Sequence, residues 1–275
     1  MIIYNLKAQT NSLIIYFLFG VIKMILSGKT ALISGGSRGI GRAIAELFYS
    51  EGANIYIMAR NAEQLGVAAK EIDVKNENRV HALPCDVSSE TSVNDALARI
   101  KADGAIVDVL VNCAGVNLRG PLEEMPLETW SKVIGINLTG TYLLAKGCFE
   151  GMKQKGGGKI INIASLMSEV ARPTISPYVA SKGGVKMFTK AIAVEWAKYN
   201  IQANSIIPGY IETEMNAPLI ADKEFNAKII ARTPAARWGK PSEVAHAALF
   251  FASHGADFIT GQEIAVDGGI LAALM

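Results

Sequence analysis

The chain has 275 residues, of which 50% are hydrophobic and 19% are charged, so it has ample apolar material for a large core and is not an intrinsically disordered protein. The formal net charge is only +2 and no long basic run is present, which argues against a nucleic-acid partner. Neither a disulfide framework nor a metal site is predicted, because the cysteines and histidines are widely spaced: Cys85, Cys113 and Cys148, and His81, His246 and His254.

Residues 1–27 are predicted to be an extension that precedes the folded domain. Its apolar run, residues 13–22, has about half the length that a membrane-spanning helix needs. No small-x-small cleavage motif follows the run, which argues against a signal peptide. We therefore favour a non-core extension, with Met24 as the natural first residue, on a cytoplasmic protein. A membrane-surface anchor is the alternative.

Residues 28–275 alternate between two kinds of pattern. Short apolar runs predict strands at 30–33, 53–58, 80–83, 107–111, 159–163, 201–207 and 263–266. Helical patterns lie between them, at 39–50, 62–75, 89–102, 127–155, 176–199 and 242–253. Buried strands separated by helices are typical of a parallel sheet covered on both faces. The sequence therefore predicts a single α/β domain, a seven-stranded doubly wound sheet (Rossmann fold) with ligands at the carboxyl ends of its strands.

A glycine-rich turn, Ser34-Gly35-Gly36-Ser37-Arg38-Gly39-Ile40-Gly41, joins the first predicted strand to the first predicted helix. Its G-x-x-x-G-x-G spacing differs from the G-x-G-x-x-G dinucleotide fingerprint. The physical advantages are the same, because glycine allows a tight turn and the amino end of a helix offers unpaired N–H groups to a pyrophosphate. At this place in the chain, the turn predicts a nucleotide site.

Two arginines indicate which dinucleotide binds. An acidic residue after the second strand would bind a free ribose 2′-hydroxyl, whereas an arginine accommodates a 2′-phosphate. Arg60 stands at that point, and Arg38 lies inside the glycine turn. Guanidinium geometry matches phosphate, so the pair favours NADP(H) over NAD(H). Two ordinary surface arginines are the alternative.

A candidate proton-transfer site follows the fifth strand. Tyr178 and Lys182 are four residues apart and share one face of a helix, and Ser165 stands at the carboxyl end of that strand. A tyrosine hydroxyl has a pKa near 10, which a neighbouring ammonium lowers by stabilising the phenolate. The three side chains together are suited to the reduction of a carbonyl group.

With these motifs in place, residues 28–270 resemble the short-chain dehydrogenase/reductase family. The ordered matches are the glycine turn, Cys85-Asp86-Val87, Asn112-Cys113-Ala114-Gly115, Ile136-Asn137-Leu138, Ser165 with Tyr178 and Lys182, Pro208-Gly209 and Val266-Asp267-Gly268-Gly269. Two positions depart from the family pattern. Ser34 replaces a threonine and keeps its hydroxyl, and Cys113 replaces an asparagine, a change expected to touch no catalytic atom.

The resemblance implies a role for each motif. Tyr178 would transfer the proton, Lys182 would lower its pKa and hold the nicotinamide ribose, Ser165 would bind the substrate oxygen, and Asn137 would position a relay water. The implied cofactor contacts are Gly35, Ser37, Arg38, Gly39, Ile40, Gly41, Arg60, Asp86, Val87, Asn112, Ala114, Gly115, Tyr178, Lys182, Pro208, Gly209, Ile211 and Thr213. The resemblance also implies a homotetramer, with helices 127–155 and 176–199 and the apolar tail 270–275 at interfaces, and a mobile helical lid at about 212–231.

A narrower resemblance, to gluconate 5-dehydrogenases, is carried by residues 165–175, 185–189, 232–239 and 266–272. It implies D-gluconate and 5-keto-D-gluconate as substrates, with the cleft lined by the segment from Ser165 to Tyr178, which includes Met167. The predicted substrate contacts are Ser165, Met167 and Tyr178, and, from the charge of the substrate, Arg119 and Arg172. A sugar acid needs a cation for its carboxylate, and Arg119 is the first candidate. For Arg172, a surface or intersubunit salt bridge is an equal alternative.

Three other functions stay open. A 3-oxoacyl carrier-protein reductase or a hexose dehydrogenase of the same family would use the same catalytic residues. A non-catalytic dinucleotide-binding scaffold would have no need of Ser165, Tyr178 and Lys182 together.

Overall fold

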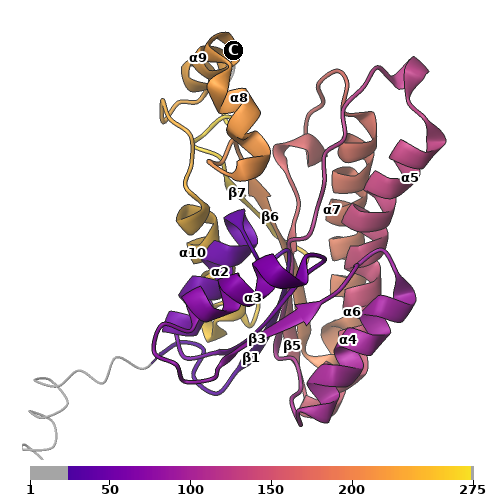
Figure 1. Ribbon diagram of the computed structural model, residues 1–275, viewed down its shortest axis with the longest axis vertical. Helices are drawn as coiled ribbons and strands as arrows, with labels where there is room; N and C mark the ends of the chain where they lie inside the picture. Colours follow the sequence, from indigo (N-terminus) through magenta and orange to yellow (C-terminus); the bar gives the residue numbers. More distant parts are fainter. Residues whose placement is uncertain (1–23, 274–275) are drawn as a thin grey trace, which may run out of the picture.

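The computed structural model describes residues 24–273, in which seven parallel strands form one sheet in the order β3-β2-β1-β4-β5-β6-β7 (Figure 1). The predicted doubly wound sheet is thereby confirmed. The order in which strands are added to the sheet reverses between β1 and β4, which is the switch point beside which such sheets bind ligands. The strands are β1 (Thr30–Ser34), β2 (Asn54–Ala59), β3 (Val80–Pro84), β4 (Val109–Asn112), β5 (Gly158–Ile163), β6 (Ile201–Pro208) and β7 (Glu263–Val266).

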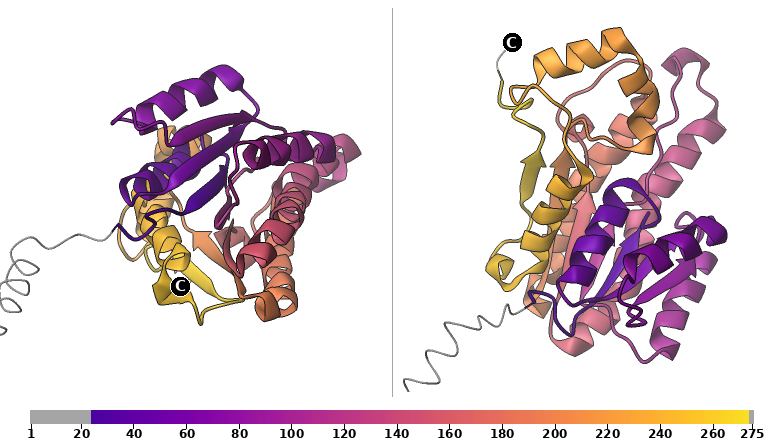
Figure 2. Two further views of the ribbon diagram at one scale, coloured as in Figure 1. Left: turned by 90° about the horizontal axis from the view of Figure 1, so that it is seen from below. Right: turned by 60° about the vertical axis from the view of Figure 1, so that its left-hand side comes forward.

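Helices cover both faces of the sheet (Figures 1 and 2). One face carries α2 (Gly39–Ser50), α3 (Ala62–Ile72) and α10 (Pro241–Ala252), which contribute to a single hydrophobic cluster with the sheet. The opposite face carries α4 (Glu90–Ala102), α6 (Gly140–Lys155) and α7 (Ser176–Trp196), which contribute to a second cluster. The central strands are buried on both sides, which explains why their sequences are continuously apolar rather than alternating.

The predicted helix 127–155 is interrupted. It consists of α5 (Leu127–Ile134), a π-helical turn (Gly135–Thr139) and α6. Inside the turn, the Asn137 side chain accepts a hydrogen bond from the Val116 N–H at 2.8 Å and donates one to the Val116 carbonyl at 3.0 Å. Such π-turns are frequent at functional sites. The hydrophobic periodicity could not show the break, because the chain remains helical on both sides of it.

Two other helices end earlier than predicted. Helix α3 stops at Ile72, since Asp73 leaves the helical conformation with a ψ of 53°. Helix α7 stops at Trp196 and continues as a short 3₁₀ turn that ends at Asn200, with φ of 59°. The 3₁₀ turns of the described chain are Leu122–Glu124, Leu166–Ser168, Ala197–Tyr199, Glu214–Asn216 and His254–Ala256.

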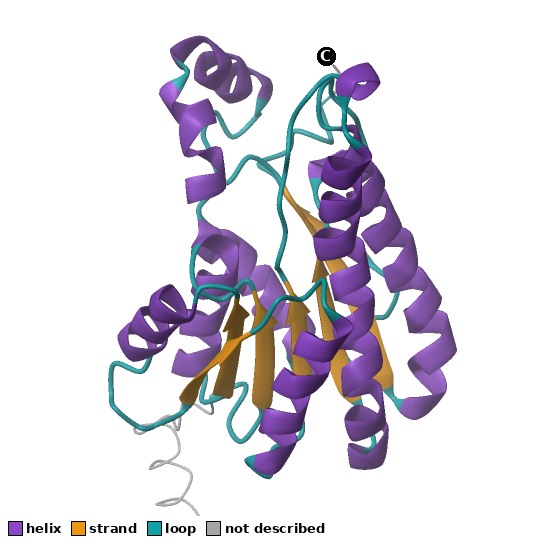
Figure 3. Ribbon diagram, turned by 45° about the vertical axis from the view of Figure 1, so that its right-hand side comes forward, coloured by secondary structure: helices purple, strands orange, loops and turns teal. Residues whose placement is uncertain are grey.

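The predicted lid forms a separate projection at the carboxyl ends of the strands (Figure 3). It contains α8 (Ala217–Ala221) and α9 (Lys223–Arg232), so it extends one residue past the predicted end at 231. A small hydrophobic cluster joins Leu219 and Ile229 of the lid to Trp238, which follows it in the chain. This cluster is separate from the two that cover the sheet. The mobility of the lid stays a prediction.

The amino-terminal boundary of the domain differs from the predicted start at residue 28. Leu26 is buried in the core, and its N–H donates to the Glu51 carbonyl at 2.9 Å. Residues 1–23, with the apolar run 13–22, and the last two residues of the predicted apolar tail lie outside the described residues. Within residues 24–273, no helix combines the length and the apolar character that a membrane span requires.

Candidate active site

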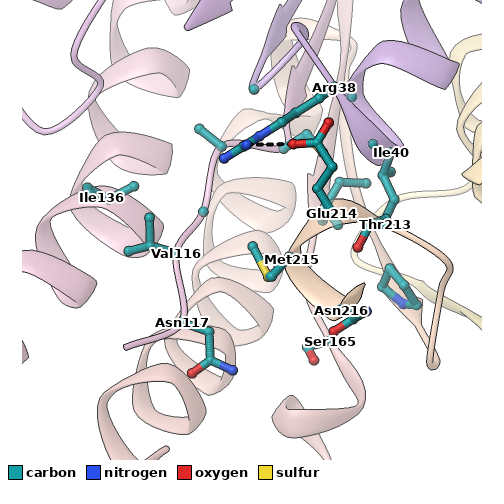
Figure 4. Close-up of a pocket in the computed structure, with 18 of the residues that line it drawn as sticks. Arg38, Ile40, Val116, Asn117, Ile136, Ser165, Thr213, Glu214, Met215 and Asn216 are labelled. Carbon is teal, nitrogen blue, oxygen red and sulfur yellow. Dashed lines mark hydrogen bonds and ion pairs between the residues drawn. The ribbon is translucent and has the colours of Figure 1, made fainter. Parts of the chain in front are cut away.

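A pocket opens at the carboxyl ends of β1, β2, β4, β5 and β6, beneath the lid. All but two of the predicted site residues line it. The cofactor set contributes Gly35, Ser37, Arg38, Gly39, Ile40, Gly41, Arg60, Asp86, Val87, Ala114, Gly115, Pro208, Gly209, Ile211 and Thr213, and the reaction end contributes Ser165, Tyr178, Lys182, Met167, Arg119 and Arg172. Figure 4 shows the lid residues Met215 and Asn216 entering the same pocket as Ser165 and Asn117.

The glycine turn has the shape of a cradle for a pyrophosphate. A Cβ added at Gly41 would lie 2.3 Å from the Gly35 carbonyl oxygen, and one at Gly35 would lie 3.0 Å from the Ala114 backbone. The Ser34 hydroxyl ties the turn to the end of β4, because it accepts the N–H groups of Cys113 and Ala114 at 3.1 Å each. Helix α2 begins without a side-chain cap or an acidic residue in its first turn. Its free N–H groups are therefore available to an anion, so the residues present fit a dinucleotide.

Asn112 does not line the pocket. Its side chain is buried and donates to the Asn162 side chain at 2.8 Å, which links β4 to β5. Its predicted contact with the cofactor stays a prediction. Asn137 is also absent from the wall: it is 1% exposed, and its amide donates to the Ser181 hydroxyl at 3.0 Å. Its predicted role with a relay water stays a prediction.

The reaction end of the pocket brings Ser165, Tyr178 and Lys182 together. Ser165 follows β5 and caps a 3₁₀ turn by accepting the Met167 N–H at 3.1 Å. Tyr178 and Lys182 project from the first part of α7. The Lys182 ammonium lies 5.7 Å from the centre of the Tyr178 ring and donates to the Ile163 carbonyl at 2.6 Å. The spacing of four residues therefore places the cation beside the phenol, as the helix geometry predicts.

Burial sets the protonation of this pair. It raises the pKa of Tyr178, an effect opposed by the hydrogen bond with the Ser165 hydroxyl. Burial also lowers the pKa of Lys182 to about 8. Without a cofactor charge in the site, the tyrosine thus keeps its proton near neutral pH. A protonated phenol is the form that can donate to a carbonyl oxygen, so the pair is prepared for reduction.

We expect the Lys182→Met protein to gain stability over wild type near neutral pH and to lose that advantage in alkali. The ammonium has a lower pKa in the folded than in the unfolded chain, so between these two pKa values the unfolded chain binds more protons and wild-type stability rises with pH. From about pH 7.5 to 9.5, the wild-type free energy of unfolding should rise by about 1–2 kcal/mol relative to the variant.

Urea unfolding of both proteins across this range measures the difference. The hydrogen bond to Ile163 is also lost in the variant, but that loss does not depend on pH, so the slope isolates the titration of Lys182. A pH-independent difference between the two proteins would contradict the lowered pKa.

Cys113 lines the pocket. The expectation that this substitution touches no catalytic atom stays a prediction. Burial raises the pKa of the Cys113 thiol to about 11, so the side chain is a neutral thiol at physiological pH.

Arg119 and Arg172 form a cationic end of the pocket. Both arginines line the pocket; burial lowers the pKa of the Arg119 guanidinium, and the positive charge of Arg172 lowers it further. Arg172 also packs over the Phe225 ring of the lid at 5.2 Å. Neither arginine pairs with a carboxylate among residues 24–273. The salt bridge considered for Arg172 is thus not formed within the described chain.

Asn117 and Glu214 are among the pocket residues that the sequence did not predict. Asn117 has a buried side-chain oxygen without a hydrogen-bond partner in the described chain, and Glu214 forms an ion pair with Arg38 (Figure 4). Neither belongs to a recognisable motif, so no pattern in the sequence could have identified them. Among the described residues, no cluster of three His, Cys, Asp or Glu side chains is placed to hold a metal ion.

The fold, the glycine cradle and the Ser165, Tyr178 and Lys182 arrangement define a class of enzyme. The chain belongs to the short-chain dehydrogenase/reductase family and is an oxidoreductase of CH–OH groups that binds a nicotinamide dinucleotide. A family model described as enoyl-(acyl carrier protein) reductase matches residues 35–271.

Individual relatives are similar to the chain over about 90% of its length. The chain is 42% identical over 249 residues to 5-keto-D-gluconate 5-reductase of Escherichia coli K12, covering 90% of this chain and 98% of the relative. It is 40% identical to gluconate 5-dehydrogenase of Gluconobacter oxydans, covering 90% and 97%. The crystal structure of a Burkholderia cenocepacia gluconate 5-dehydrogenase in complex with NADP and tartrate is 40% identical and superposes with a TM-score of 0.87, covering 92% of this chain and 98% of that one.

Proposed function

We propose that the protein interconverts 5-keto-D-gluconate and D-gluconate with NADP(H). The observation that carries the proposal is that Arg119 and Arg172, two cations without a carboxylate partner in the described chain, line the same pocket as Ser165 and Tyr178. A sugar acid supplies the missing carboxylate, and its keto group can then reach the proton donor. The gluconate-acting relatives support the same substrate class.

Each side chain at the reaction end has a defined task in this proposal. The bound nicotinamide supplies or accepts the hydride. Tyr178 donates its phenolic proton to the substrate oxygen during reduction, and Ser165 holds that oxygen by a hydrogen bond. Lys182 stabilises the phenolate that remains, because its ammonium lies beside the ring. For oxidation the phenolate must form first, and burial of Tyr178 opposes this step.

Arg38 and Arg60 are the proposed ligands of the 2′-phosphate of NADP(H). Both line the adenosine end of the pocket, and both are exposed enough to meet a phosphate without a large desolvation cost. The solved relative that contains NADP supports this choice.

The test is NADPH oxidation, followed by absorbance, with 5-keto-D-gluconate, with an acetoacetyl thioester and with NADH in place of NADPH. Turnover of the keto acid with a preference for NADPH supports the proposal. Turnover of the thioester alone would support the second candidate, a 3-oxoacyl carrier-protein reductase. That candidate is favoured by the family description and by a 37% identical 3-oxoacyl carrier-protein reductase of Aquifex aeolicus.

Replacement of Arg119 by alanine should weaken substrate binding selectively. The substrate carboxylate would lose a charge-assisted hydrogen bond, so KM for 5-keto-D-gluconate is expected to rise about 10- to 30-fold, with a smaller change in kcat. Steady-state kinetics with 5-keto-D-gluconate and with a neutral hydroxyketone measure the effect. Arg99→Ala, an exposed arginine on α4 far from the pocket, is the matched control. An equal rise in KM for the neutral hydroxyketone would show that Arg119 does not bind the substrate carboxylate.

The homotetramer implied by the resemblance remains part of this proposal. Large apolar side chains are exposed on the helices expected at its interface, including Leu127 on α5 and Val194 on α7, which are 77% and 82% exposed. Such residues support a further contact surface on this face.

A further inference from the structure

Arg38, the proposed phosphate ligand of the glycine turn, already has an anionic partner in the protein. Its Nη1 donates to the Glu214 carboxylate at 2.7 Å, across 176 positions of sequence. Figure 4 shows the two side chains meeting at the upper end of the pocket. Glu214 begins the 3₁₀ turn Glu214–Asn216, which leads directly into α8 of the lid. The pair therefore joins the cofactor-binding turn to the start of the lid.

The ion pair between Arg38 and Glu214 is weak enough for another anion to replace Glu214. The Arg38 and Glu214 side chains are 64% and 67% exposed, and exposed pairs contribute little to stability. Glu214 is also the sole carboxylate within ion-pair distance of Arg38 in the described chain. Nothing else in residues 24–273 thus holds the guanidinium in place against a stronger anion.

A 2′-phosphate is such an anion. It carries up to about two negative charges and accepts two parallel N–H groups from a guanidinium. A carboxylate on the same guanidinium repels it and occupies one of its donors. NADP(H) must therefore displace Glu214 or bind beside its charge, whereas NAD(H) has no phosphate at this point and is indifferent to the pair.

We propose that Glu214 is a cofactor-selectivity residue, which occupies Arg38 in the cofactor-free enzyme and is exchanged for the 2′-phosphate when NADP(H) binds. The inference rests on the proposed binding of NADP(H) by Arg38. Its consequence is that the affinity for NADP(H) is held below what the two arginines alone would provide. A second consequence is that phosphate binding releases the first turn of the lid from the glycine turn.

The test compares Glu214→Gln with wild type in equilibrium binding of NADPH, NADH, 2′,5′-ADP and 5′-ADP, followed by calorimetry. The variant is expected to bind NADPH and 2′,5′-ADP about two- to fivefold more tightly, the range for loss of one exposed ion pair, and to leave NADH and 5′-ADP unchanged. Glu212→Gln is the matched control, because Glu212 carries the same charge two residues earlier, is exposed and forms no ion pair with Arg38 in the described chain.

A second arm uses Arg38→Ala. In that background Glu214→Gln should no longer change NADPH affinity, since the guanidinium for which the two anions compete is gone. Unchanged or weaker NADPH binding by Glu214→Gln in the wild-type background would overturn the inference, as would an equal gain for NADH or for Glu212→Gln. If Arg38→Ala itself leaves NADPH affinity unchanged, the proposed phosphate site is wrong. If Arg38→Ala weakens NADPH binding but Glu214→Gln has no effect, the inference alone fails.

Discussion

The Tyr178→Phe protein is expected to reduce the proposed substrate, 5-keto-D-gluconate, about 10³-fold more slowly than wild type while it binds NADPH with similar affinity. The substitution removes a single oxygen, the proposed proton donor, and leaves the ring over which Lys182 lies. Because the loss concerns the proton-transfer step, it should appear in kcat rather than in KM. Single-turnover reduction and NADPH titration measure the two quantities separately.

Tyr142→Phe is the control for this substitution, since Tyr142 is 43% exposed on α6 and remote from the pocket. It should behave as wild type in both assays. A Tyr178→Phe protein that kept most of its turnover would show that another group, or water, protonates the substrate. The proposed roles of Ser165 and Lys182 would then need a different proton donor.

A second large effect is expected from Gly41→Ala. The added methyl group would lie 2.3 Å from the Gly35 carbonyl oxygen, so one of the two backbone segments must move. Gly35 cannot shift freely, because its N–H donates to the Met58 carbonyl at 2.8 Å. The N–H groups of the turn would then no longer converge on a pyrophosphate. We expect NADPH affinity to fall about 100-fold, as for the loss of two charge-assisted hydrogen bonds, and stability to fall by about 1–3 kcal/mol.

Gly66→Ala provides the matched control for Gly41→Ala. Gly66 lies inside α3, and a Cβ added there meets no atom within 4 Å. The same substitution should therefore stabilise the protein by about 0.4–1 kcal/mol and leave NADPH binding unchanged. Calorimetric titration with NADPH and urea unfolding test both proteins. If Gly41→Ala bound NADPH as tightly as wild type, the close packing of Gly41 against Gly35 would not be needed for cofactor binding.

Features that depend on neighbouring residues could be predicted from the sequence, whereas contacts between distant residues could not. The strands and the glycine turn were predicted because continuous apolar runs and glycine spacing are local properties of the chain. The pairing of Tyr178 with Lys182 is also a local property, since residues four positions apart lie on the same face of a helix. The π-turn around Asn137 is local as well, but it depends on a side chain that reaches the backbone of Val116, twenty-one residues away.

The amino-acid sequence by itself thus determined the parallel sheet, the place of the nucleotide turn and the residues of the reaction end. Tertiary structure alone decided where side chains find partners distant in the chain. It directed Asn112 into the sheet toward Asn162, brought Arg172 and Arg119 into one pocket, and joined Arg38 to Glu214. The physical reason is that backbone periodicity follows from neighbouring residues, whereas the partner of a polar side chain is selected by which segments the packed core brings within hydrogen-bond distance.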